Sequence, residues 1–221
     1  MGGVEESRAR RSLPGMDLDA LAYAAQRRGW SYLPHDPSLR AHFREARGAD
    51  PRRVVRGRHE GKWFVAFETE QDNSYVDGNT MMTVHSTTVR QVVALDLGVE
   101  LPSLEVTPQG AISRLFGQRA VIPTGHAGFD HANAVRTPWP EFAGDVLPGI
   151  LPVLLQWPPI AWRFDGRSLV TVAGDALRID HIDAMLAFAT AVADAVPSAV
   201  WQRLGRGDGD EGGPTRHGAG G

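Results

Sequence analysis

The sequence TTVRQVVALDL, residues 87–97, decides the fold class because its apolar and polar side chains alternate. In an extended chain Val89, Val93 and Leu95 lie on one face, and Gln91 is the polar exception on that face. A period of two in a segment rich in β-branched residues favours a strand with one well-buried face. We therefore predict a central strand here, with neighbouring segments of the chain paired beside it.

Further apolar runs lie on both sides of this segment. WFVAF at residues 63–67 precedes it and LEVT at 104–107 follows it, and strands that are consecutive in sequence usually pair with each other. Later in the chain, Asp165 and Gly166 separate IAWRF from RSLVTV, which is the composition of a hairpin with a two-residue type I′ turn. These runs predict a mainly antiparallel sheet that includes this hairpin.

Two segments have helical periodicity. Near the C-terminus, apolar residues from Ile182 to Val196 form one continuous face, and Pro197 ends the pattern. Near the N-terminus, Asp17 is a candidate N-cap, and Gly29 is placed to close the helix just after Arg28. The sequence thus predicts an N-terminal helix and a C-terminal amphipathic helix that packs on the sheet.

The predicted fold class is α+β, with a mainly antiparallel sheet of about seven short strands. A doubly wound parallel fold is disfavoured because strands and helices do not alternate regularly. We expect one domain over residues 16–204. Residues 1–15 and 205–221 are small, polar and aperiodic, so we expect both tails to be disordered.

Composition excludes several classes of function. The chain has 221 residues, a net charge of −3 and no cysteine, so disulfides and cysteine-based metal or iron–sulfur sites are excluded. It has no run of about 18 apolar residues that would span a bilayer. The negative net charge and the lack of an RNA-binding aromatic motif argue against a nucleic-acid partner. The expected location is the cytoplasm.

Several short motifs together resemble a family of uncharacterised actinobacterial proteins of unknown function. They are RGW at 28–30, VVALDL at 92–97, the W-R-F-x-G pattern at 162–166 and VPSAVW at 196–201, within a resemblance that covers roughly residues 20–202. Many members of that family look as if an N-terminal membrane helix precedes the RGW motif. The resemblance therefore implies association with a membrane, although MGGVEESRARRSLPG at 1–15 is not apolar enough to be such a helix. It implies no catalytic residues.

No established catalytic motif occurs in the sequence, so we predict no catalytic residues and no cofactor. The favoured function is a non-catalytic interaction module or a membrane-peripheral module. Eight basic residues lie between Arg40 and Lys62, in a chain of negative net charge. Arg52, Arg53, Arg56 and Arg58 are the candidates for binding an anionic membrane surface, and a protein is the alternative partner.

Two alternatives from other classes stay open. One is a carrier or sensor that binds a small apolar ligand in a groove lined by Trp139, Trp157 and Trp162. The other is a hydrolase that uses the HAGFDH segment, residues 126–131. His126, Asp130 and His131 in that segment are weak candidates for metal ligands. Their spacing matches no established metal motif, so no metal site is predicted.

Overall fold

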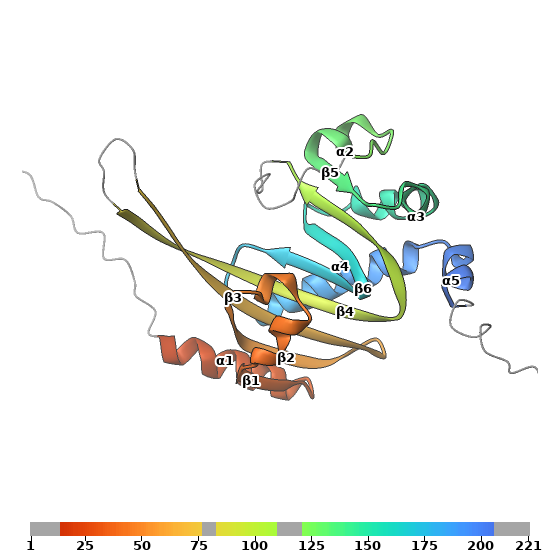
Figure 1. Cartoon of the computed structure of the whole chain (residues 1–221). Helices are drawn as coiled ribbons and strands as arrows, with labels where there is room; N and C mark the ends of the chain where they lie inside the picture. The colour runs from red at the N-terminus through yellow and green to blue at the C-terminus, as the bar shows by residue number, and fades with distance from the viewer. Residues whose placement is uncertain (1–13, 77–82, 110–120, 206–221) are drawn as a thin grey trace, which may run out of the picture.

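The computed structural model describes residues 14–76, 83–109 and 121–205. These residues form a six-stranded antiparallel sheet with helices packed on it, which confirms the predicted α+β class (Figure 1). Neighbouring strands follow the order β1-β2-β3-β4-β5, and β6 also pairs with β4. The predicted tails at 1–15 and 205–221 lie almost entirely outside the described residues. The strands are β1 (Ser31–His35), β2 (Asp50–His59), β3 (Lys62–Val76), β4 (Thr83–Pro108), β5 (Asn133–Arg136) and β6 (Ala161–Ala173).

Strand β4 is the centre of the sheet, as the alternating sequence predicted. Residues 91–95 are buried on both faces, since β3 and β6 flank this part of β4 and both faces of the sheet are covered there. Gln91, the polar exception, is also buried, and its amide nitrogen lies 3.3 Å from Nδ1 of His181. Beyond this centre, β3 and β4 continue as a two-stranded ribbon that projects past the other strands (Figure 1).

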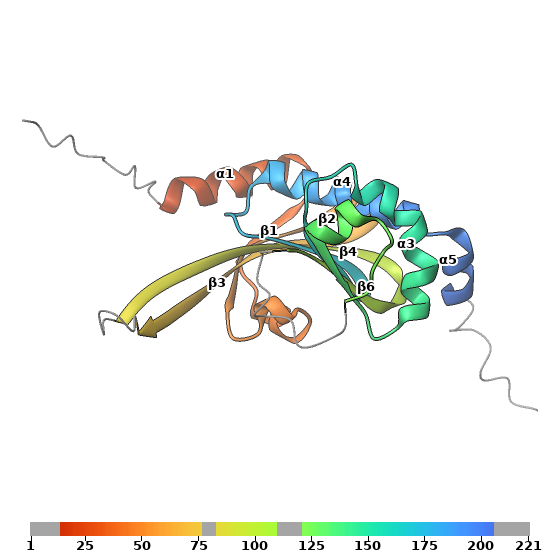
Figure 2. The same ribbon diagram turned by 90° about the horizontal axis from the view of Figure 1, so that it is seen from above.

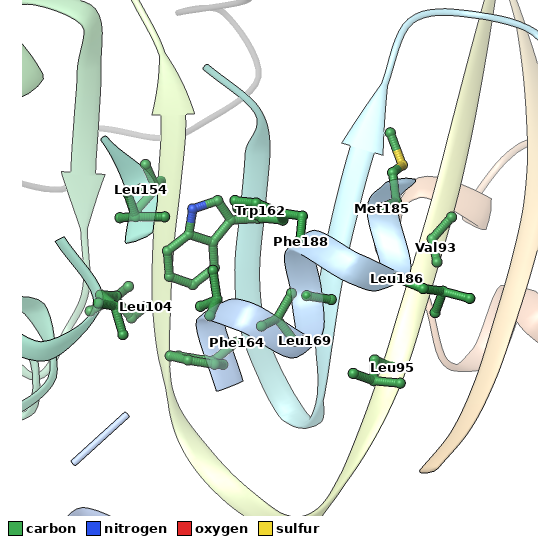
Figure 3. Packing of buried hydrophobic residues seen from close by; sticks show 14 of the residues in the cluster. Val93, Leu95, Leu104, Leu154, Trp162, Phe164, Leu169, Met185, Leu186 and Phe188 are labelled. Carbon is green, nitrogen blue, oxygen red and sulfur yellow. The ribbon is translucent and has the colours of Figure 1, made fainter. Parts of the chain in front are cut away.

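The same strand bends sharply near its middle, and β6 bends with it (Figure 3). The pairing of β4 with β6 shifts register between Asp96 and Leu101 and again before Leu104. Gly98 has a φ of 79° in this region, a backbone conformation that glycine adopts without steric cost. We call residues 83–97 and 101–108 the first and second halves of β4; the first pairs with β3 and the second with β5.

The predicted hairpin at Asp165 and Gly166 is wrong. Residues 161–173 form one strand, β6, whose two ends pair with the two halves of β4 and not with each other. A type I′ turn needs positive φ at both central residues, and only Gly166 has it, at 57°. The Asp-Gly pair therefore lets β6 follow the bend of β4, with Gly166 opposite Leu101.

Gly166 gives a test of this bend. A valine there would be β-branched at positive φ, so Gly166→Val should lower the free energy of unfolding by about 1 kcal/mol or more. Asparagine tolerates the left-handed region much better, and nothing lies within 4 Å of a Cβ added at this position. Chemical denaturation should therefore rank Gly166→Asn well above Gly166→Val. Equal stability of the two variants would show that the bend does not require positive φ.

Helices cover one face of the sheet, as Figure 2 shows edge on. Helix α4 (Ile179–Ala195) lies across both halves of the bent β4–β6 pair, and this is the predicted C-terminal amphipathic helix. In Figure 3, Leu186 and Phe188 of α4 lie among Leu95, Leu169 and Trp162 of the strands, all members of the main hydrophobic core. The other helices are α1 (Pro14–Arg27), α2 (Ala127–Ala132), α3 (Pro140–Leu154) and α5 (Ser198–Gly205).

The N-terminal helix ends where the sequence predicts. Gly29 follows α1 with a φ of 70°, its N–H donates to Gln26 and the N–H of Trp30 donates to Ala25. These two bonds form a Schellman motif, which satisfies carbonyls at the end of a helix. Helix α1 packs beside β1 and α4, so the predicted N-terminal helix belongs to the same helical layer.

The opposite face of the sheet is covered only in part. Two short 3-10 helices, η1 (Pro37–Ala41) and η2 (Arg44–Ala46), lie on it in the connection between β1 and β2 (Figure 2). Leu39 and Phe43 from this connection pack on Phe67 and Val92, forming a second, smaller core. The connection that contains η1 and η2 therefore lies beside the bent β4–β6 pair, on the face of the sheet that carries no long helix.

No single helix in the described ranges is long and apolar enough to cross a membrane. Helices α4 and α5 reach that length only together, and they meet at an angle of 85°.

Candidate functional site

A groove of about 360 Å³ lies between the two halves of the bent β4–β6 pair. Both halves of β4, both ends of β6 and η2 supply its walls. Its volume falls in the range of about 300–1,000 Å³ that is usual for ligand sites. The bend therefore creates the groove, because it brings together the two ends of β6, which a straight strand would hold far apart. The lining residues are Arg44, Glu45, Thr88, Arg90, Glu105, Thr107, Pro108, Pro159, Ile160, Ala161, Trp162, Arg163, Val172, Ala173 and Gly174.

Most of the uncharged lining is apolar. Pro159, Ile160 and Ala161 come from the start of β6 and the loop before it, and Val172 comes from its other end. Val172 is half-buried and also packs on the smaller core beneath η1 and η2. An apolar surface with a few charged groups at its margin is the usual composition of a site for a small organic ligand.

A buried ion pair anchors one side of the groove. Arg163 of β6 donates to both carboxylate oxygens of Glu45 in η2, at 2.6 and 3.0 Å, and its Nε donates to Asp165 at 2.9 Å. Only 3% of the Arg163 side chain and 7% of the Glu45 side chain are exposed. Buried charges are tolerated when they are paired in this bidentate way, so the contact holds η2 in place against β6.

Arg44 extends the network toward the second half of β4. Its guanidinium donates to Glu45 at 3.1 Å and to both carboxylate oxygens of Glu105. Burial acts to raise the pKa of Glu45, but the charges of Arg163 and Arg44 outweigh it and hold that pKa below its ordinary value. Burial likewise acts to lower the pKa of Arg44, and Glu105 and Glu45 more than reverse this, so the net shift is upward. Both shifts favour the charged forms of Glu45 and Arg44.

Arg90 is different from the other two arginines of the groove. It lies on the first half of β4, is half-buried, and lines the groove together with Val172 and Gly174. Within the described residues it makes no ion pair or hydrogen bond. The lining thus contains three guanidinium groups and two carboxylates, and Arg90 is the cation without a counter-charge.

The structure brings together two of the three tryptophans predicted to line a ligand groove, Trp157 and Trp162, and leaves Trp139 apart. Trp139 is 59% exposed and precedes α3. Trp162 is buried between Phe164 and Phe188, and Trp157 also packs edge-on against Phe188. Trp157 and Trp162 share a smaller cavity of about 130 Å³. Trp162 is the single member of the predicted set that lines the larger groove.

Most of the arginines predicted to bind an anionic surface have partners within the chain. Arg52 pairs with Glu70, Arg53 with Glu68 at 2.9 Å, and Arg56 with Asp36. Arg58 instead lies over the ring of Trp63, with its guanidinium carbon 4.4 Å from the ring centre. Trp63 is 56% exposed, so this stacked pair forms an amphipathic feature of the surface.

The HAGFDH segment has structural roles. His126 caps α2 through Nδ1, which accepts the N–H of Phe129 at 3.1 Å. Asp130 accepts from the N–H and hydroxyl of Thr124, and the backbone hydrogen bond lowers the pKa of the carboxyl. His131 is exposed at the end of the helix. In the ranges that the structure describes, no three His, Asp or Glu side chains group together as metal ligands.

Sequence reasoning missed the charged residues of the groove. Arg163 and Glu105 both interrupt short apolar runs, IAWRF and LEVT, in segments predicted to be strands. A charge within an apolar strand must be paired if that face is buried, and this was the available signal. The partner was not readable, because Glu45 lies 118 residues from Arg163 in the chain.

No family model and no curated protein matches this chain. One solved structure is similar in fold, the crystal structure of the mycobacterial trehalose monomycolate transport factor A, TtfA. The TM-score is 0.61 over 80% of this chain and 93% of that one, with 12% sequence identity. At that identity the likeness concerns the fold alone.

Proposed function

We propose that this chain is a non-catalytic binding protein that holds an amphiphilic molecule, with the apolar part of the ligand in the groove between the halves of β4 and β6. The observation that carries the proposal is the groove itself, which combines an apolar lining with charged groups supplied by a fixed network. Apolar lining provides affinity for a hydrocarbon chain through removal of its surface from water. Fixed polar groups provide orientation.

The similar fold of the transport factor supports the same class of function. That protein is described as a factor in the transport of trehalose monomycolate. We carry over only the general idea of a factor that takes part in the transport of another molecule. The resemblance of the sequence to actinobacterial proteins with membrane helices supports a proposal of the same kind, namely that this molecule is one found near a membrane.

Calorimetric titration with decanol and with decanoate tests the binding function, with decanoate kept below its micellar concentration and decanol below its solubility limit. We expect saturable binding of at least one of them to the full chain. Ala161→Trp fills the groove from β6, because Ala161 lies two residues from Arg163 and so points to the same face. This variant should lose the binding. Ala184→Trp, at an exposed position of α4, is the matched control and should retain it. If neither decanol nor decanoate binds, the proposed function is contradicted.

Peripheral contact with an anionic surface is a second candidate function. It is supported by one feature, the exposed Trp63 stacked on Arg58. Tryptophan is favoured at the boundary between lipid and water, and a basic residue near an anionic bilayer gains about 1 kcal/mol. The proposal concerns only Arg58 and Trp63, because the other three candidate arginines already pair with carboxylates of the chain. These are Arg52, Arg53 and Arg56.

Sedimentation with liposomes tests the surface contact. We expect more of the chain to pellet with anionic than with neutral liposomes, and less at physiological than at low salt, because exposed charges are screened. Arg58→Gln should reduce pelleting with anionic liposomes. Arg52→Gln should not, because Arg52 is already paired with Glu70. Pelleting that is independent of lipid charge and of salt would contradict an electrostatic contact.

A further inference from the structure

Among the described residues, Arg90 is the charged group of the groove that makes no ion pair. Arg163 is neutralised by Glu45 and Asp165, and Arg44 is neutralised by Glu45 and Glu105. Arg90 lies on β4 opposite Thr69, a buried residue without charge. Its guanidinium, half-buried beside an apolar lining, has no anion among the described residues with which to pair.

Arg136 adds positive charge on the same side. It lies opposite Glu105 on the neighbouring strand, and its guanidinium donates to Thr107, a lining residue, at 2.9 Å. Glu105 is itself bound by Arg44. The polar margin of the groove therefore carries more cationic than anionic groups.

Resting on the proposed function, we propose that the ligand is a single-chain amphiphile with an anionic oxygen-bearing head, and that Arg90 binds the head. A planar guanidinium binds carboxylate or phosphate oxygens through two parallel hydrogen bonds, which is stronger and more specific than a single neutral contact. The hydrocarbon chain then lies along Val172 and Ile160. The negative charge of the head then pairs with Arg90, which has no carboxylate partner among the described residues.

Titration calorimetry with ligands of equal chain length tests the head group directly. Decanoate and decyl phosphate should each bind the full chain about tenfold or more tighter than decanol, because a hydrogen bond to a charged group is stronger than one to a neutral group. The tighter of the two anions identifies the preferred head. Decanol binding as tightly as both anions would overturn the assignment of the head, while the proposed function would stand.

Arg90→Gln isolates the residue. This variant should weaken binding of the preferred anion about tenfold and weaken binding of decanol by a clearly smaller factor. Arg167→Gln is the matched control, since Arg167 is an exposed arginine of β6 that pairs loosely with Asp96 outside the groove. Unchanged binding of the anion to Arg90→Gln would overturn the inference. If neither anion nor alcohol binds the parent chain, the proposed function fails, and this inference with it.

Should Arg90→Gln fold poorly, the salt dependence of the parent chain gives the same answer. Binding of the anion should weaken as salt is raised, while binding of decanol should not. Anion binding that is insensitive to salt would contradict recognition of the charge.

Discussion

Arg163→Met is expected to lower the free energy of unfolding by about 3 kcal/mol, one of the two largest effects predicted for this chain. The substitution keeps much of the volume of the side chain and removes its charge. Glu45 then lies 7% exposed without its bidentate partner. The expected loss is at the lower end for a buried pair, because Arg44 still contacts Glu45. Chemical denaturation of the parent and variant measures it.

Two further variants show whether the loss comes from the buried ion pair. Arg178→Met removes an arginine whose pair with Asp180 is exposed, and should change stability far less than Arg163→Met. The double variant Arg163→Met, Glu45→Leu should recover part of the loss, because no buried carboxylate is then left unpaired. If Arg163→Met is as stable as Arg178→Met, the ion pair does not hold η2 on the sheet.

The same pair gives the stability a predictable dependence on pH. The pKa of Glu45 is lowered in the folded chain, so its contribution is fully present above the ordinary glutamate value of 4.5 and is lost as the pH falls through the lowered value. Glu45→Gln should therefore show a shallower loss of stability on acidification than the parent. A parallel decline in both would show that Glu45 is not held ionised by Arg163.

Leu186→Ala is the second large effect, with an expected loss of about 2–5 kcal/mol. Leu186 is fully buried in the middle of α4, where it packs among Val93 and Leu95 in the main core (Figure 3). Leu155→Ala is the matched control, since Leu155 is 48% exposed after α3. Similar melting temperatures for the two variants would show that α4 is not packed on the bent strands as described.

Sequence patterns predicted individual elements of this fold well where a single local signal, such as alternation or a capping glycine, decides the structure. The alternation in residues 87–97 identified the buried centre of β4, and Gly29 marked the end of α1. The sequence predicts about seven short strands and the described residues form six, because β4, a single strand of 26 residues, and β6 each contain two of the predicted strands. Alternation does not distinguish two strands from one strand with a bend.

The candidate site was much less predictable, because the sequence pattern does not show that β4 and β6 each continue through a bend. Asp165 and Gly166 carry the composition of a hairpin, but β4 offers partners along both halves of β6, and pairing with a bent neighbour replaced pairing across the turn. The groove exists only because of that shared bend. Its charged residues come from η2, β4 and β6, and their proximity depends on contacts between distant segments.

The prediction of a groove lined by tryptophans shows a related limit. An aromatic residue in a strand faces one side of the sheet or the other, and a single sequence does not say which side is open. Trp162 borders the groove but packs its ring against Phe188 of α4, and Arg163, the next residue, pairs with Glu45 on the groove side. Arg163, and not Trp162, was therefore the residue of β6 that indicated which face of the sheet carries the groove.

Photolabelling locates the ligand most directly. A decanoate analogue with a diazirine at its methyl end would be irradiated with the full chain, with and without excess unlabelled decanoate, and the labelled residues mapped by mass spectrometry. We predict competable labelling of the apolar lining at Pro159, Ile160, Ala161 or Val172. Competable labelling confined to the cavity beside Trp157 and Phe188, or to the surface beside Trp201, would contradict a ligand site between the halves of β4 and β6.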